Sequence, residues 1–95
     1  MSYYYRGIAY AKKDQYDKAN PDYSKALELN PRLAEAYSNR GITYDTKGQY
    51  DKAITDYSKA IELNPGLAQA YNNRGLTYAN NMVNMTKLSL ITTRP

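Results

Sequence analysis

Small and aromatic residues recur at helical spacing between residues 34 and 46. Ala34, Tyr37, Gly41 and Tyr44 follow one another at intervals of three and four, which gathers them on one side of a helix. The segment Lys47-Gly48-Gln49 then interrupts the pattern with a turn signal. The sequence therefore predicts one helix that ends near residue 47.

A second helix is predicted directly after this turn. Asp51 stands where an N-cap or first-turn acid is favoured, and Asn64-Pro65 ends the segment because proline disfavours a helical residue before it. Between these limits the apolar positions again fall at intervals of one, three and four, through Ala53, Ile54, Tyr57, Ala60 and Ile61. The unit is therefore a helix, a turn and a helix.

This unit is repeated along the chain with an offset of 34 residues. The offset superimposes three tripeptides, Arg6-Gly7-Ile8, Arg40-Gly41-Ile42 and Arg74-Gly75-Leu76. Between residues 6 and 34, 21 of 29 positions are identical to those between residues 40 and 68, and 9 of 12 positions between residues 33 and 44 match residues 67 to 78. A constant period of this length is the signature of a repeat protein. About two and a half copies are present.

The repeated residues resemble the tetratricopeptide repeat (TPR) family, whose 34-residue unit is a helix pair. In the second copy the family's small, aromatic and proline positions are occupied by Tyr37, Gly41, Tyr44, Ala53, Tyr57, Ala60 and Pro65. The first copy supplies Tyr3, Gly7, Tyr10, Ala19, Tyr23, Ala26 and Pro31, and the third supplies Tyr71, Gly75 and Tyr78. Ten of the twelve tyrosines fall in this pattern once Tyr16 and Tyr50 are included. The resemblance implies an all-α fold in which antiparallel helix-turn-helix repeats stack as a right-handed solenoid.

The resemblance also gives the domain boundaries. Residues 1–80 form the repeat array, with repeat 1 at 1–33, repeat 2 at 34–67 and the first helix of repeat 3 at 67–80. Pro21 departs from the pattern, because its counterpart is Thr55, and it predicts a late start or a kink of the helix near residue 20. Asp14 stands where Gly48 stands and predicts a less ideal turn.

Composition removes most kinds of chemistry. The chain has no Cys and no His, so it lacks a thiol nucleophile, an imidazole base and the usual zinc ligands. We therefore predict no enzyme, no catalytic residues, no cofactor and no metal site. The 13 Lys and Arg alternate with 9 Asp and Glu without a basic stripe, which argues against a nucleic-acid partner. No apolar run has the length of a membrane span and no secretory signal is visible, so we expect a cytoplasmic protein without a membrane partner.

The family's binding surface is the concave side of the solenoid, lined by the first helix of each pair. The resemblance thus implies a protein-interaction scaffold that binds a peptide or a helix of a partner protein. The groove candidates at the corresponding positions are Tyr4, Tyr5, Ile8, Ala11, Lys12, Glu35, Ser38, Asn39, Ile42, Asp45, Thr46, Gln69, Asn72, Asn73, Leu76 and Asn80. A carboxamide offers both donors and an acceptor, so Asn39 and Asn73 suit a peptide backbone, although both also fit an ordinary polar helix surface.

Three further features of this surface have alternative interpretations. Tyr4 and Tyr5 are either binding hot spots, because they lie outside the repeat pattern, or residues of a fraying helix end. The clamp of Lys, Asn and Arg that chaperone-binding members use for a carboxylate is matched only at Asn39, which argues against a chaperone tail as ligand. The Arg residues at 34-residue spacing suggest either a phosphate ladder or stems that pack between helices with heads paired to acids; we favour the second.

The periodicity stops after Asn80, and residues 81–95 resemble no part of the repeat. We expect this divergent tail to be poorly ordered, although an adventitious strand or a cover over the preceding helix is also open. Residues 67–80 would then lose the helix that should cover them, which favours a homo-oligomer through this segment. Both ends fall within a repeat, so the alternative to a scaffold is a truncated or artificial fragment that self-associates and has no selected ligand.

The tail has an origin that can be tested. Codons permitted for Met82 to Pro95, read from the third base of the Met82 codon, encode Gly-Gln-Tyr-Asp-Lys-Ala-Ile-Thr-Asp-Tyr-Asn-Lys-Ala. This product matches Gly48 to Ala60, which lies 34 residues earlier, at 12 of 13 positions without a gap. We hypothesise that residues 82–95 are a frameshifted copy of the next repeat.

The nucleotide sequence of the gene checks this hypothesis. We expect the shifted frame to continue the repeat through the codons of residues 82 to 95. Synonymous codons that do not encode the repeat in the shifted frame would exclude a frameshift.

Overall fold

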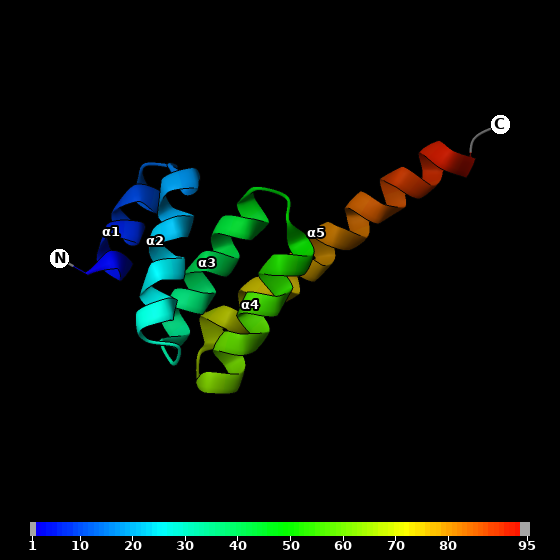
Figure 1. Ribbon diagram of the computed structural model, residues 1–95. Helices are drawn as coiled ribbons and strands as arrows, with labels where there is room; N and C mark the ends of the chain where they lie inside the picture. Colours follow the sequence, from blue (N-terminus) through cyan, green and yellow to red (C-terminus); the bar gives the residue numbers. More distant parts are fainter. Residues whose placement is uncertain (1, 94–95) are drawn as a thin grey trace.

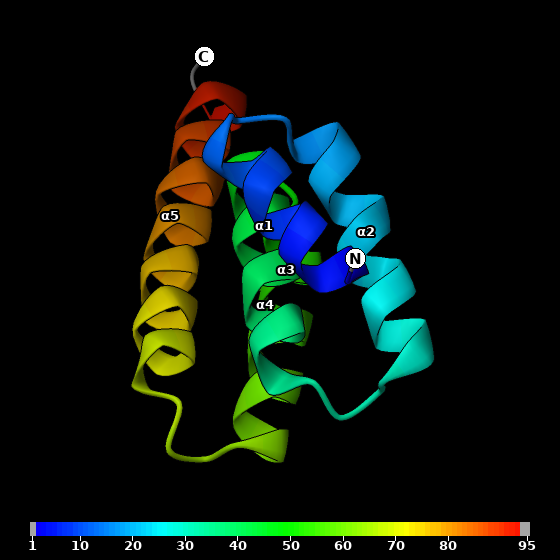
Figure 2. The same cartoon turned by 90° about the vertical axis from the view of Figure 1, so that its left-hand side faces the viewer.

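The computed structural model describes residues 2–93, and the described residues form five helices without a strand (Figure 1). The helices are α1 (Tyr3–Lys12), α2 (Tyr16–Leu29), α3 (Ala34–Thr46), α4 (Tyr50–Leu63) and α5 (Ala68–Thr93). Consecutive helices pack against one another, α1 on α2, α2 on α3, α3 on α4 and α4 on α5. The two views in Figures 1 and 2 show them as antiparallel pairs that follow one another in a row. The predicted all-α repeat fold is confirmed.

In the pairs α1–α2 and α3–α4, a tyrosine ring of the second helix packs directly on a glycine of the first helix. A Cβ atom built on Gly7 would meet the ring of Tyr23 at 2.8 Å, and one built on Gly41 would meet the ring of Tyr57 at 2.7 Å. No side chain fits into such a distance, so glycine is required at these two positions. Both rings are almost fully buried, and burial raises the pKa of each phenol to about 12. This Gly–Tyr contact sets how closely the two helices of a pair approach.

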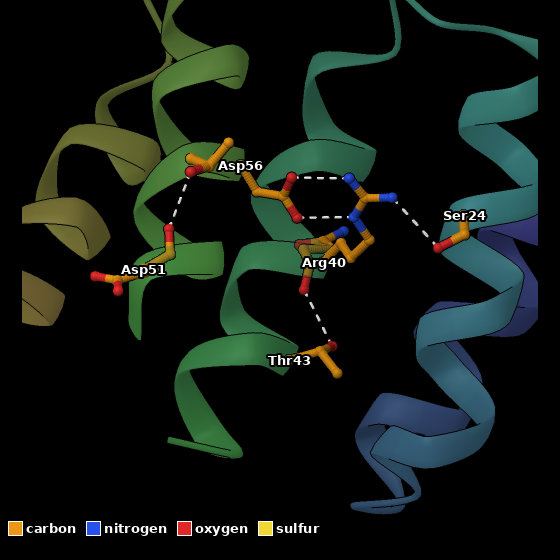
Figure 3. A network of polar contacts seen from close by, with 7 residues as sticks. Ser24, Arg40, Thr43, Asp51 and Asp56 are labelled. Atoms are coloured by element: carbon orange, nitrogen blue, oxygen red, sulfur yellow. Dashed lines mark hydrogen bonds and ion pairs between the residues drawn. The ribbon is translucent and has the colours of Figure 1, made fainter. Parts of the chain in front are cut away.

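An arginine and an aspartate connect the same two helices beside the ring. Arg40 donates from Nε and Nη2 to the two carboxylate oxygens of Asp56, at 2.7 and 2.8 Å (Figure 3). Arg6 holds Asp22 in the same way, with both distances at 2.8 Å. Both aspartates are buried, and a bidentate guanidinium supplies two charge-assisted hydrogen bonds that offset the cost of burying the carboxylate. The predicted pairing of these arginine heads with acids is therefore confirmed for Arg6 and Arg40.

Arg40 and Arg74 each connect their own repeat to the repeat before it. Nη1 of Arg40 donates to the Ser24 hydroxyl at 3.3 Å, so Arg40 joins α2, α3 and α4 (Figure 3). Nη1 of Arg74 donates to the Ser58 hydroxyl at 3.1 Å, which repeats the contact one layer later. Among the side chains that the structure describes, no carboxylate lies within ion-pair distance of Arg74. Arg74 thus contacts the preceding helix pair through Ser58, but it has no aspartate partner such as Asp56 provides for Arg40.

Pro21 lies inside α2 without shifting its ends. α2 and α4 both have 14 residues and begin and end at corresponding positions, so the predicted late start near residue 20 is wrong. Proline removes a single hydrogen bond, and its ring is exposed. The buried residues Ala19, Tyr23 and Ala26 hold the helix in register, because helix stability in proteins comes mainly from packing.

The turns within the pairs use the left-handed backbone region. Gly48 has a φ of 78°, and Asp14, which occupies the same position in the first pair, has a φ of 58°. A residue with a Cβ atom is strained in this region, although aspartate tolerates it better than most. The prediction of a less ideal first turn agrees with this backbone geometry.

The tail differs from the expectation of a poorly ordered segment, because the backbone of α5 continues as a helix to Thr93. With 26 residues α5 has twice the length of α3, and it extends beyond the other helices (Figure 1). No glycine or proline lies between Gly75 and Pro95, so nothing in this stretch stops a helix. No helix among the described residues is both long and apolar enough to cross a membrane.

The Arg6–Asp22 pair makes the stability of the fold depend on pH. Hydrogen bonds from Arg6 lower the pKa of Asp22. The carboxylate therefore contributes stability above the ordinary aspartate pKa of about 3.9, and this contribution is lost as pH falls through the lower folded value. In urea titrations we expect the midpoint of Asp22→Asn to lie below that of the original chain at pH 7, with the difference shrinking below pH ~4.

The arginine side of the pair provides the control. Arg6→Gln removes the same two hydrogen bonds, so its deficit should shrink over the same pH range. Deficits that stay constant between pH 7 and pH 2 would show that the pair does not set the ionisation of Asp22.

Candidate functional site

A hollow of about 260 Å³ lies between α1 and α3, on the side of the solenoid formed by the first helices. Five of its eight lining residues are groove candidates from the sequence, and Tyr16, Tyr23 and Thr43 complete it. The five are Ile8, Ala11, Lys12, Asn39 and Ile42. Helical spacing brings them together, because positions three and four apart face the same way on each helix.

An apolar row runs along the first helices through this hollow. Ile8, Ile42 and Leu76 occupy the same position in α1, α3 and α5. The two isoleucines are half-buried, whereas 64% of Leu76 is exposed. An exposed leucine beside two partly covered isoleucines offers apolar area to a ligand that lies across the three helices.

Tyr4 connects the first two repeats. Its hydroxyl accepts a hydrogen bond from the Asn39 side-chain amide at 3.2 Å, and its ring lies 6.3 Å from that of Tyr23. The pKa of the half-buried Tyr4 phenol is raised, mainly by burial and then by the nearby Glu35 carboxylate. Tyr5 packs edge-on against Tyr4 and keeps 65% of its surface exposed. Tyr5 is therefore the more accessible of the two rings.

The two groove asparagines lie in different environments. One Nδ2 hydrogen of Asn39 is used by Tyr4, which leaves Asn39 part of its bonding capacity. Asn73 is also half-buried, and its carboxamide makes no hydrogen bond to another described residue. The reason is local: the residue that corresponds to Tyr4 in the second repeat is Ser38, whose short side chain makes no such bond. Asn73 consequently keeps its donors and its acceptor for a ligand.

The other candidates separate into buried and exposed residues. Ser38 is only 2% exposed, so its side chain is not accessible to a partner; the sequence did not reveal this because a small residue fits either environment. Asp45 is half-buried, and its Oδ1 atom has no hydrogen-bond partner among the described residues. The remaining candidates are exposed on the helix surfaces: Lys12, Glu35, Thr46, Gln69, Asn72 and Asn80.

Sequence reasoning missed the side chains that fix the first helices in place. Ser24 and Ser58 receive the arginine contacts between repeats, and Asn39 receives support from Tyr4. A signal for the serines was present, since each lies 16 residues before an arginine of the repeated tripeptide. The Tyr4–Asn39 contact had no such signal, because tyrosine occupies that position in the first repeat alone.

Family models match most of the chain. Two models of the tetratricopeptide repeat match residues 34–67 and 56–88, and a TPR repeat model matches residues 7–48. A search of curated protein sequences finds no match.

Solved structures give the same fold. A crystal structure of MamA is 38% identical with a TM-score of 0.80, covering 83% of this chain and 46% of that chain. YrrB, described as a TPR protein with an unusual peptide-binding site, is 32% identical with a TM-score of 0.80 over 84% of this chain and 41% of its own. The first TPR of Spaghetti (RPAP3), bound to the HSP90 peptide SRMEEVD, is 28% identical with a TM-score of 0.77, over 79% and 60%.

The chain spans about half the length of the MamA structures that it resembles. The overlapping family models extend from residue 7 to residue 88, and the solved structures reproduce the helix pairs that the Gly–Tyr contacts close. The chain therefore belongs to the tetratricopeptide repeat family.

Proposed function

We propose that the chain is a protein-interaction scaffold that binds a segment of a partner protein across α1, α3 and α5. The observation that carries this proposal is the apolar row of Ile8, Ile42 and Leu76, which passes through a hollow and has half-buried polar side chains beside it. The peptide-bound state of the similar RPAP3 domain supports a peptide as the kind of ligand.

The residues around the apolar row of Ile8, Ile42 and Leu76 indicate the chemical groups that a ligand should carry. An apolar side chain would fill the hollow between Ile8 and Ile42, because its burial is favourable and the hollow is open to solvent. The carboxamide of Asn73 suits a backbone amide of an extended peptide, since it both donates and accepts. The half-buried Asp45 adds a negative charge to α3, which favours a cationic side chain in the ligand through its charge.

An acidic chaperone tail fits this surface poorly. Of the Lys, Asn and Arg clamp expected for a terminal carboxylate, the chain matches only Asn39, and part of that amide is used by Tyr4. Tyr4, Ile8, Gln69 and Asn73 stand at the other clamp positions. Glu35, which lies near Tyr4, and Asp45 both add negative charge to α3. We therefore propose a partner segment that is apolar and basic.

We also propose binding without catalysis. The chain has no Cys or His, and its Asp, Glu and Lys residues recur on the helix surfaces with the period of the repeat. The exposed tyrosines and amides offer contact area and hydrogen bonds to a ligand.

Selection from a phage-displayed library of linear dodecapeptides tests the groove. We expect selected peptides to carry apolar and basic residues. In fluorescence titrations, Leu76→Ala and Asn73→Ala should each weaken binding of the best synthetic peptide roughly tenfold, because each removes about 1.4 kcal/mol of contact. Circular dichroism melting checks that both variants keep the fold.

Two controls define the site. Glu62→Ala alters an exposed residue of α4 outside the hollow and should leave the affinity unchanged. The peptide SRMEEVD should not compete with the selected peptide. Equal affinity of the selected peptide for the original chain, Leu76→Ala and Asn73→Ala would contradict binding in this groove.

A further inference from the structure

One side of α5 carries an apolar stripe that no other described segment covers. Tyr71 is 44% exposed, Tyr78 48% and Met82 68%, and helical spacing aligns all three with Gly75. The corresponding side of α3 lies under α4, where Tyr37 and Tyr44 are half-buried. A neighbouring side of α5 is packed, since Ala70 and Thr77 have no exposed surface. We refer to Tyr71, Gly75, Tyr78 and Met82, together with Arg74, as the α5 face.

Gly75 provides the space for an aromatic ring. At Gly7 and Gly41 a Cβ atom would collide with a tyrosine of the covering helix, at 2.8 and 2.7 Å. At Gly75 nothing lies within 4 Å of the same position. The α5 face therefore has the shallow notch that receives a ring in the other two pairs, and the notch is open.

Arg74 provides the charge, and it contacts the preceding repeat as Arg40 does. Its Nη1 donates to Ser58 at 3.1 Å, as Nη1 of Arg40 donates to Ser24 at 3.3 Å. Its guanidinium carbon lies 5.7 Å from the centre of the Tyr71 ring, the same distance that separates Arg40 from Tyr37. In Arg40 the Nε and Nη2 atoms donate hydrogen bonds to Asp56. The same two atoms of Arg74 make no hydrogen bond to a described residue.

These groups favour one kind of occupant. A guanidinium edge of this geometry binds a carboxylate through two parallel hydrogen bonds. A second copy of the chain docked with its own α5 face cannot supply one, because α5 contains no Asp or Glu. The occupant must therefore bring a carboxylate to Arg74 and an aromatic ring to Gly75 on one surface.

We propose that the α5 face binds an amphipathic helix of another protein that carries adjacent aspartate and tyrosine residues. The aspartate pairs with Arg74, the tyrosine ring covers Gly75, and small residues one turn away on either side let the two helices approach. Helix α4 has this arrangement, with Asp56 and Tyr57 between the buried Ala53 and Ala60. This surface is distinct from the groove, because Leu76 points to another side of α5 than Gly75 and Tyr78 do.

A synthetic peptide with the sequence of residues 50–63 is the probe, because it reproduces the helix that covers the corresponding side of α3. Titrated into the full chain, a fluorescent version should bind to one saturable site and gain helical circular dichroism on binding. Arg74→Gln and Gly75→Ala should each weaken this binding at least tenfold. The exposed residue Val83 lies on another side of α5, so Val83→Ala should leave the affinity unchanged.

Each variant has its own specific readout. Gly75→Ala should raise the melting temperature of the chain alone, since nothing contacts that position and alanine favours a helix, while it blocks the peptide. A peptide with Asp56→Asn should bind the original chain more weakly, and should lose nothing further on Arg74→Gln, because the two changes remove the same interaction.

Three outcomes would overturn the proposal. The first is the absence of saturable binding of the peptide. The second is binding that survives both Arg74→Gln and Gly75→Ala, which would mean that the peptide replaces α4 on α3. The third is self-association of the chain in sedimentation that Gly75→Ala abolishes and the peptide does not prevent, which would make a second copy the occupant.

Discussion

The close contact between a glycine and a tyrosine ring is the constraint on which the rest of the structure depends. At Gly41 the ring of Tyr57 occupies the place of a Cβ atom, so any other residue would push α4 away from α3. The Arg40–Asp56 pair lies beside this contact and connects the same two helices. Because Gly7 and Tyr23 repeat the contact, the two layers have the same geometry. The pairs then stack through α2 on α3 and α4 on α5, which brings α1, α3 and α5 to one side.

This arrangement gives α5 three different sides. Ala70 and Thr77 pack on the preceding helices, Leu76 continues the apolar row of the groove, and Tyr71 and Tyr78 flank Gly75 on the α5 face. In the proposed scheme a peptide in the groove and a helix on the α5 face contact different side chains. Both ligands would nevertheless contact the same helix, α5.

Much of the fold could be predicted from the sequence, because the period of 34 residues repeats the same contacts in each unit. Gly41, Tyr57 and Ala60 identified the helix pair, and the structure buries all three. Features present in only one copy of the repeat were harder to predict. Pro21 predicted a late helix start or a kink near residue 20, but packing of Ala19 and Tyr23 keeps α2 at full length.

The candidate site was less predictable than the fold, since it depends on contacts between repeats. Ser38 is buried, whereas the corresponding Tyr4 reaches across to Asn39 and Asn72 is exposed. The position of a residue in the repeat predicted which side of the helix it lies on. It could not predict how far the side chain is buried, because burial depends on the side chains of the neighbouring repeat. The helical backbone after Asn80 also lay outside the repeat pattern, which gave no information on that segment.

The most direct test adds a covering helix to α5. Residues 82–95 are replaced by Gly-Gln-Tyr-Asp-Lys-Ala-Ile-Thr-Asp-Tyr-Asn-Lys-Ala, and Gly75→Ala is then measured in both chains by urea unfolding. We predict a change of sign: Gly75→Ala stabilises the original chain by roughly 0.5–1 kcal/mol and destabilises the extended repeat by roughly 1–3 kcal/mol. The same stabilising effect in both chains would contradict the claim that a ring packed on glycine closes each helix pair.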